Sequence, residues 1–169
     1  MTTETTQVYR VWIKATPEKI WAAITDPEFN GRYAYQAPSH YELRKGGSFH
    51  SAATAEMKAF GAANGFEIPD TILDGEVLES EPPRRLVQTW RSLMDPRTAS
   101  EPYTVLTWEI EDAKMQPGVC KLTVTHQLTD APATAAMVGS TEDSGAGGGW
   151  GWILSDLKTF VETGRNFVE

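Results

Sequence analysis

The sequence contains a single cysteine, Cys120, among 169 residues. That excludes a disulfide within the chain and suits a reducing compartment. No segment approaches the roughly 18 consecutive apolar residues that a membrane-spanning helix needs. The first ten residues, MTTETTQVYR, lack the basic region and apolar run of a secretory signal. We therefore expect a soluble cytoplasmic protein without a membrane partner.

Positive charge is also scarce, with 15 Lys and Arg against 23 Asp and Glu and a net charge of −8. Binding to nucleic acid or to anionic lipid needs concentrated positive charge, so we expect neither partner. Three histidines, His40, His50 and His126, are too few and too scattered for a zinc motif, and no G-x-S-x-G nucleophile motif occurs. We expect no metal and no cofactor, and no motif demands catalysis.

Glycine is concentrated in one place, the segment GAGGGWGWILSDLKTF at residues 145–160. A dinucleotide-binding fingerprint would need glycine where Trp150 stands, and the preceding residues do not predict a strand. We therefore interpret the glycines as sites of close packing, where the absence of Cβ atoms lets the start of the last helix approach its neighbours.

What the sequence does contain is an ordered series of strand and helix patterns. Helices are expected at 16–24, where Thr16 and Pro17 suit the first turn, at 26–34, ending near Asn30-Gly31, and over roughly 20 residues ending near Gly164. Residues 54–70 predict an irregular insert or flap, with a short helix as the alternative. Strand patterns occupy residues 7–15, 39–45, 47–53, 71–80, 84–92, 102–111 and 118–128.

This order predicts a single α+β domain over residues 1–169, with an antiparallel sheet. Alternation within the last strand places Cys120, Leu122, Val124, His126 and Leu128 on one face. That face is apolar apart from His126, so we expect it to point inward. By the same rule Leu106 and Trp108 face inward, as do Leu86, Gln88 and Trp90, although Val87 competes with Gln88 for the inner face.

The order and spacing of six blocks resemble the START-like SRPBCC superfamily. Within it the chain is similar to the family named for activators of a heat-shock-protein ATPase. The resemblance implies a helix-grip fold, in which a curved antiparallel sheet of about six to seven strands surrounds a long C-terminal helix, with two short helices after the first strand. It also implies a cavity for apolar small molecules between sheet and helix. The blocks are IKATPEKIWAAITDPE, LRKGGSF, LDGEVLESEPPRRLVQTW, LTWEIE, KLTVTHQL and GGGWGWILSDLKTFVETG.

Such a cavity would be walled by apolar side chains, with His126 and Gln88 as the polar groups that orient a ligand. The structural alternatives stay open: His126 can be a core histidine bonded to a backbone carbonyl, and the tryptophans can fill the space themselves. The expected ligand-binding residues are Trp21, Gln88, Trp90, Trp108, Leu122, Val124, His126, Trp150 and Leu154. The expected entrance residues are Tyr33, Tyr35, Met57 and Phe60.

The main hypothesis is therefore the binding of a hydrophobic or aromatic small molecule. A second hypothesis is a polyketide cyclase-like enzyme in which His126 acts as general acid or base, since such enzymes need little more than a shaped cavity and a group that moves a proton. A third is an interaction with a heat-shock chaperone. The resemblance implies that the co-chaperone proper uses an additional N-terminal domain, whereas this sequence begins almost at the first strand, so we do not expect chaperone activation. A homodimer stays open.

Overall fold

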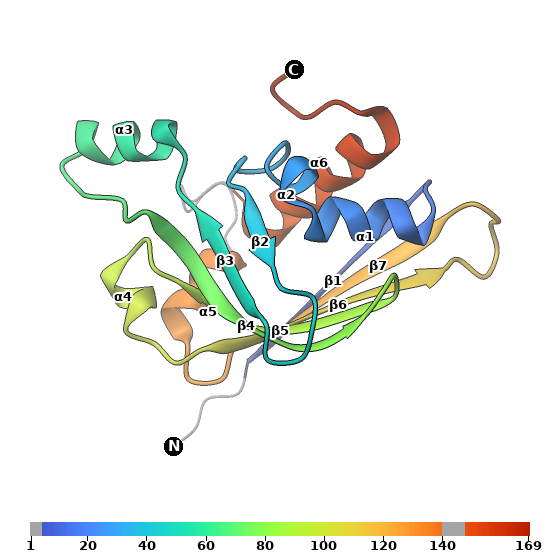
Figure 1. Cartoon of the computed structure of the whole chain (residues 1–169), viewed down its shortest axis with the longest axis horizontal. Helices are drawn as coiled ribbons and strands as arrows, with labels where there is room; N and C mark the ends of the chain where they lie inside the picture. Colours follow the sequence, from blue (N-terminus) through green and yellow to red (C-terminus); the bar gives the residue numbers. More distant parts are fainter. Residues whose placement is uncertain (1–4, 140–147) are drawn as a thin grey trace.

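The computed structural model describes residues 5–139 and 148–169 of the chain. Seven strands form one antiparallel, curved sheet in the spatial order β1-β7-β6-β5-β4-β3-β2 (Figure 1). All seven predicted strand segments are confirmed, with shifts of a few residues at their ends. The strands are β1 (Thr6–Ile13), β2 (Ser39–Tyr41), β3 (Ser48–Ala52), β4 (Thr71–Glu81), β5 (Arg85–Ser92), β6 (Thr104–Asp112) and β7 (Cys120–Gln127).

The first helix after β1 begins where its capping residue predicts, and the second ends at Asn30 as expected. In α1 (Pro17–Thr25) the Thr16 hydroxyl accepts a hydrogen bond from the Lys19 backbone N–H at 3.3 Å. In α2 (Pro27–Asn30) the Asp26 carboxylate accepts from the Glu28 N–H at 2.9 Å. Each cap satisfies a backbone donor that the first helical turn leaves unpaired.

The C-terminal helix α6 (Gly149–Thr163) is 15 residues long, shorter than the expected 20. It ends as predicted at Gly164, which adopts the left-handed conformation with φ of 76°. Residues 145–147 of the glycine-rich segment lie outside the described residues, so the expectation of close packing can be followed only from Gly148 onward.

Three further helices are α3 (Ala55–Ala63), α4 (Pro96–Ala99) and α5 (Pro132–Val138). The first lies within the segment expected to be an insert, whereas α4 and α5 were not predicted. The reason is clear for α5, whose first backbone N–H groups are bound by a distant side chain. The Glu101 carboxylate accepts from the N–H groups of Ala133 at 2.6 Å and Thr134 at 2.9 Å. Local sequence carries no trace of such a cap.

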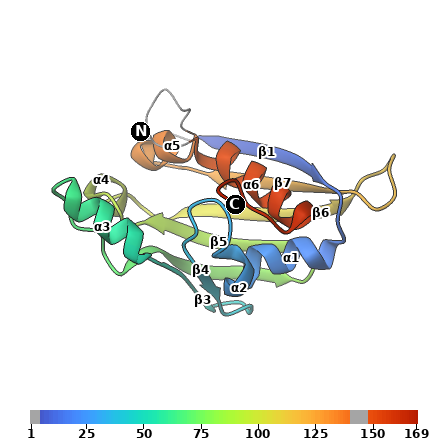
Figure 2. The same cartoon turned by 90° about the horizontal axis from the view of Figure 1, so that it is seen from above.

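The helices α1, α2 and α6 lie on the concave side of the sheet, with α6 packed on β1 and α1 on β6 (Figures 1 and 2). Helix α3 lies at the end of the molecule remote from α1 in both views. This arrangement leaves the concave side between α6 and the strands β2 to β6 as the place where a cavity can form. Among residues 5–139 and 148–169, no helix combines the length and apolar character needed to cross a bilayer.

The inner face of the sheet follows the predicted alternation. In β7 the residues Cys120, Leu122, Val124 and His126 are all buried. In β5 the inner position belongs to Gln88, whose side chain contacts Trp108 across the neighbouring strand. The sheet therefore presents a mostly apolar inner layer to α1 and α6, and Gln88 and His126 are among its buried polar side chains.

Candidate functional site

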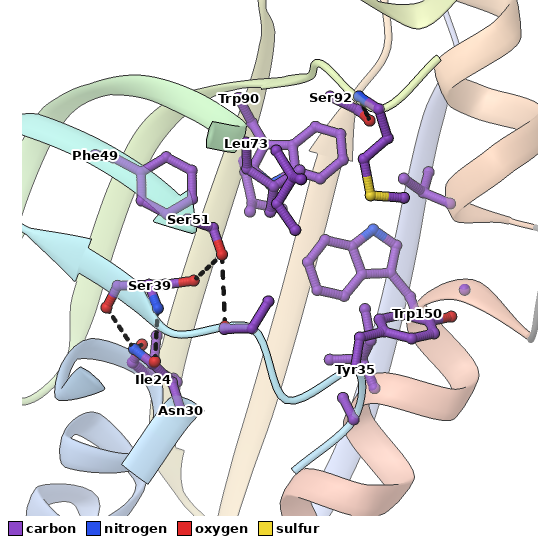
Figure 3. Close-up of a pocket in the computed structure, with 18 of the residues that line it drawn as sticks. Ile24, Asn30, Tyr35, Ser39, Phe49, Ser51, Leu73, Trp90, Ser92 and Trp150 are labelled. Atoms are coloured by element: carbon purple, nitrogen blue, oxygen red, sulfur yellow. Dashed lines mark hydrogen bonds between the residues drawn. The ribbon is translucent and has the colours of Figure 1, made fainter. Parts of the chain in front are cut away.

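A cavity of about 260 Å³ lies between the start of α6, the strands β2 to β6 and the loop that follows α2 (Figure 3). The sequence folds around it in this way because alternation directs Trp90 of β5 and Trp108 of β6 to the inner face, while Trp150 lies in the first turn of α6. The aromatic side chains of its wall are Tyr33, Tyr35, Tyr41, Phe49, Trp90, Trp108 and Trp150.

Charge is missing from this wall. Of the described residues that line the cavity, none is an aspartate, glutamate, lysine, arginine or histidine. Burial raises the pKa of Tyr41 far above its usual range, so that its hydroxyl stays protonated. The described part of the chain also contains no cluster of three or more acidic, histidine or cysteine side chains that could hold a metal ion.

The polar side chains on the β2–β3 side of the cavity are occupied by bonds within the wall. The Asn30 amide donates to the Ser39 carbonyl and accepts from the Ser39 N–H, both at 2.8 Å. The Ser39 hydroxyl donates to that of Ser51 at 3.2 Å (Figure 3). The Ser51 hydroxyl in turn donates to the Pro38 carbonyl at 3.2 Å. These groups fix the loop after α2 against the sheet and leave a largely apolar surface.

Gln88 stands behind the wall, where it is fully buried and does not line the cavity. Its side-chain oxygen accepts hydrogen bonds from the Trp108 indole N–H at 3.2 Å and from the Tyr41 hydroxyl at 3.1 Å. Because an indole N–H can only donate, the oxygen of the amide must face Trp108. Gln88 therefore orients two aromatic side chains of the wall, and its own nitrogen is buried without a hydrogen-bond partner among the described residues.

His126 holds a third aromatic side chain in the same manner. Its Nδ1 accepts from the Trp150 indole N–H at 3.1 Å, which fixes the second nitrogen, Nε2, as the protonated one. Nε2–H then donates to the Thr104 hydroxyl at 2.7 Å, and that hydroxyl donates to the Trp90 carbonyl at 2.8 Å. Burial lowers the pKa of His126 from 6.5 to about 4, so the ring is neutral at physiological pH. This chain of bonds joins α6 to β7, β6 and β5.

The loop that follows α2 and lines the cavity is held by a buried carboxylate of α6. One oxygen of Asp156 accepts from the Ala34 N–H at 2.7 Å, and the other accepts from the Phe167 N–H at 2.9 Å. Ala34 and Gln36 both have positive φ, 54° and 58°, which is unfavourable for residues with a Cβ atom. Asp156 therefore compensates for a strained loop and ties the C-terminal residues to it.

The start of α6 approaches α5 so closely that only glycine fits. A Cβ atom on Gly149 would lie 2.0 Å from the Val138 carbonyl oxygen, and the residue has φ of +53°. Both residues line the cavity. At this position the structure confirms the expectation that glycine serves close packing.

The expected site residues fall into three groups. Six of them line the cavity: Tyr33, Tyr35, Met57, Trp90, Trp108 and Trp150. Gln88 and His126 lie behind the wall and touch it through hydrogen bonds. The remaining five do not line it: Trp21, Leu122, Val124 and Leu154 are buried in the core, and Phe60 is 64% exposed on α3, where it packs edge-on against Phe66.

The cavity also has residues that the sequence did not single out. Tyr41, Phe49 and Ser51 on β2 and β3 share one face by strand alternation, a signal that was available. Met94 and Met137 come from the segments near α4 and α5, for which no helix was expected, so no sequence signal placed them.

Comparison with known proteins places this geometry in a family. The family profile described as "Activator of Hsp90 ATPase homolog 1-like protein" matches residues 14–162. Among the curated proteins, none matches the sequence.

Several solved structures have the same fold. One is MLL2253 from Mesorhizobium loti, with a TM-score of 0.64 and 21% identity over 93% of this chain and 96% of that one. CalU16 from Micromonospora echinospora has a TM-score of 0.60 and 20% identity over 92% and 73%. PFC0360w, an HSP90 activator from Plasmodium falciparum, has a TM-score of 0.57 and 20% identity over 95% and 96%. At this identity the likeness shows the fold alone, whereas the profile match covers most of the chain. The chain thus has the helix-grip fold and belongs to the Activator of Hsp90 ATPase homolog 1-like family.

Proposed function

We propose that this protein binds a small, uncharged, apolar molecule in the cavity between the sheet and α6. The observation that carries the proposal is the composition of the wall: three indoles, three phenols and a phenyl ring surround about 260 Å³, and no charged side chain is among the described lining residues. A cavity for apolar small molecules at this place is also what the resemblance to the START-like superfamily implies. The volume lies just below the usual range for drug-sized ligands, which favours a compact molecule.

The lack of charge makes the proposal selective. A carboxylate or ammonium group buried in this wall would lose its hydration without gaining a partner, which costs several kcal/mol. A fatty acid or an amine with its charged group inside is therefore disfavoured. A compact neutral aromatic compound or ketone meets no such penalty.

The geometry gives less support to an enzyme that uses His126. Both ring nitrogens are engaged with other side chains, at 2.7 and 3.1 Å, and the ring does not line the cavity. A general acid or base has to reach the proton that it transfers. A chaperone-related function is supported only by the likeness to the Plasmodium falciparum HSP90 activator, and that likeness is one of fold.

A thermal-shift assay with matched neutral and charged compounds tests the proposal. Naphthalene-type aromatics and long-chain alcohols would be compared with the corresponding carboxylates. A neutral ligand at a hundred times its Kd adds about 2.7 kcal/mol, which corresponds to a rise in Tm of roughly 5–10 °C for a chain of this size. The carboxylates should give little shift.

Two variants connect the shift to the cavity. Leu73 lines the cavity, so Leu73→Trp should fill it and abolish the shift. Leu43 is 40% exposed and does not line it, so Leu43→Trp should leave the shift unchanged. The proposal is wrong if no neutral compound stabilises the protein, or if carboxylates stabilise it equally.

A further inference from the structure

The three indoles of the cavity wall differ in what their N–H groups bind. The Trp108 N–H donates to Gln88 and the Trp150 N–H donates to His126. Both donors are thereby directed into the protein, and these rings offer the cavity only carbon. The Trp90 N–H has no hydrogen-bond acceptor among the residues that the structure describes.

The Trp90 N–H is also not sealed within the wall. Among the described residues, the buried polar side-chain atoms without a partner are Ser80 Oγ and Gln88 Nε2, so the Trp90 nitrogen keeps access to solvent space. Trp90 as a whole is only 7% exposed, and it lines the cavity. Its ring is held edge-on against His126, with centroids 5.3 Å apart and planes at 85°. Trp90 is therefore held in position in the cavity wall, and its N–H is an accessible donor without an acceptor in the described part of the chain.

A second donor lies on the same face of the same strand. Ser92 is two residues beyond Trp90 on β5 and also lines the cavity. Its hydroxyl oxygen accepts from the Met94 N–H at 3.4 Å (Figure 3). The hydroxyl proton is given to no acceptor in the described part of the chain, so it can turn toward a ligand. The β5 side of the cavity thus differs from the β2–β3 side, where the hydroxyls of Ser39 and Ser51 already donate within the wall.

From this asymmetry we infer that the ligand carries a hydrogen-bond acceptor, a carbonyl oxygen in the simplest case, and that the Trp90 N–H binds it. The inference rests on the proposed function and specifies its ligand as a neutral, compact ketone, quinone or lactone with an apolar body. A hydrocarbon in the same place would displace water from the Trp90 N–H without replacing its hydrogen bond. A buried donor left unpaired in this way is costly, so the site discriminates against ligands that lack the acceptor.

The test uses fluorene and 9-fluorenone, rigid neutral compounds that differ at one ring carbon, which carries a carbonyl oxygen in the ketone. Binding of each is measured by calorimetry to the full chain and to two variants. Trp90→Phe removes the free N–H together with part of the ring. Trp108→Phe is the matched control, because it removes a similar area from the same wall but an N–H that already donates to Gln88.

In the wild type, fluorenone should bind about three- to tenfold more tightly than fluorene, the contribution of one neutral hydrogen bond. Trp90→Phe should reduce this preference to about one, whereas Trp108→Phe should weaken both compounds and keep the preference. A second readout uses the wild-type protein alone. In its proton NMR spectrum the Trp90 indole resonance should move downfield with fluorenone and not with fluorene.

Each outcome points to a different conclusion. Equal binding of the two compounds to the wild type, or a preference that survives in Trp90→Phe, overturns the assignment of Trp90 and leaves the proposed function in place. Failure of both compounds to bind, with the protein folded as judged by its thermal transition, contradicts the proposed function itself.

Discussion

Replacing His126 should change how the stability of the protein depends on pH. In the folded state burial lowers the pKa of His126 to about 4, whereas in the unfolded chain it returns to about 6.5. Below pH 6.5 the unfolded state therefore binds a proton that the folded state does not. Stability is fully present above pH 6.5 and is lost as the pH falls from 6.5 toward 4.

The size of the effect follows from the two pKa values. With a folded value of about 4 and an unfolded value of 6.5, linkage gives a loss of about 2 kcal/mol between pH 7.5 and pH 5. Carboxylates with lowered pKa values, such as those of Glu42, Asp95 and Glu101, lose their contribution at lower pH. Measurements that stop at pH 5 thus separate the histidine from the acids.

The assay is urea unfolding at pH 7.5, 6.5, 5.5 and 5.0, followed by tryptophan fluorescence. His126→Asn keeps an acceptor for the Trp150 N–H and removes the titration, so its stability should be lower at pH 7.5 and nearly constant down to pH 5. His40→Asn is the control, because His40 is exposed on the outer face of β2, and it should follow the wild-type slope. Equal slopes for the wild type and His126→Asn would refute the reasoning that the ring is buried in its neutral form.

Three other predictions concern the same framework. Gly149→Ala should lower the free energy of unfolding by about 2–4 kcal/mol, since its Cβ would meet the Val138 carbonyl. In the same denaturant titration Gly151→Ala should raise the free energy of unfolding by up to about 1 kcal/mol, because a Cβ atom at this position of the same helix meets open space. Asp156→Ala leaves two N–H groups without their acceptor and should lower the free energy of unfolding by about 2–4 kcal/mol in the same titration. Amide hydrogen exchange at Ala34 should become faster, and unchanged exchange would contradict the role given to the carboxylate. Nitrogen NMR of the histidine rings at pH 7 should show His126 protonated at Nε2 alone, and protonation at Nδ1 would contradict the bond from the Trp150 indole.

Much of the fold could be predicted because its signals are local and periodic. Strand alternation placed Leu122, Val124 and His126 on the inner face of β7, and all three are buried. Capping residues located the start of α1 and the end of α6. The elements that were missed lack such signals: the N–H groups at the start of α5 are satisfied by Glu101, some thirty residues away, and no pattern near Pro132 reveals it.

The cavity itself was harder to predict, because its position depends on where the packed side chains leave space. Alternation placed Trp90 and Trp108 on the inner face, and both line the cavity. The same rule applied to Leu122 gives an inward side chain that is buried in the core elsewhere. Inward direction is a property of the strand, whereas the position of the empty space depends on the angle and distance of α6, which the sequence pattern does not contain.

The polar residues show why composition alone was a poor guide to ligand contacts. Gln88 and His126 stood out as the polar groups of an apolar face, and the natural hypothesis was that a ligand would bind them. In the structure their hydrogen bonds go to the indoles of Trp108 and Trp150, so they orient the wall and remove its donors from the cavity. An apolar wall built of tryptophan needs such partners, because a buried indole N–H usually binds an acceptor. Trp90 is then the informative residue, because its indole N–H has no partner in the described part of the chain. The donor proposed for the ligand thus belongs to a side chain that sequence analysis treated as an apolar contact.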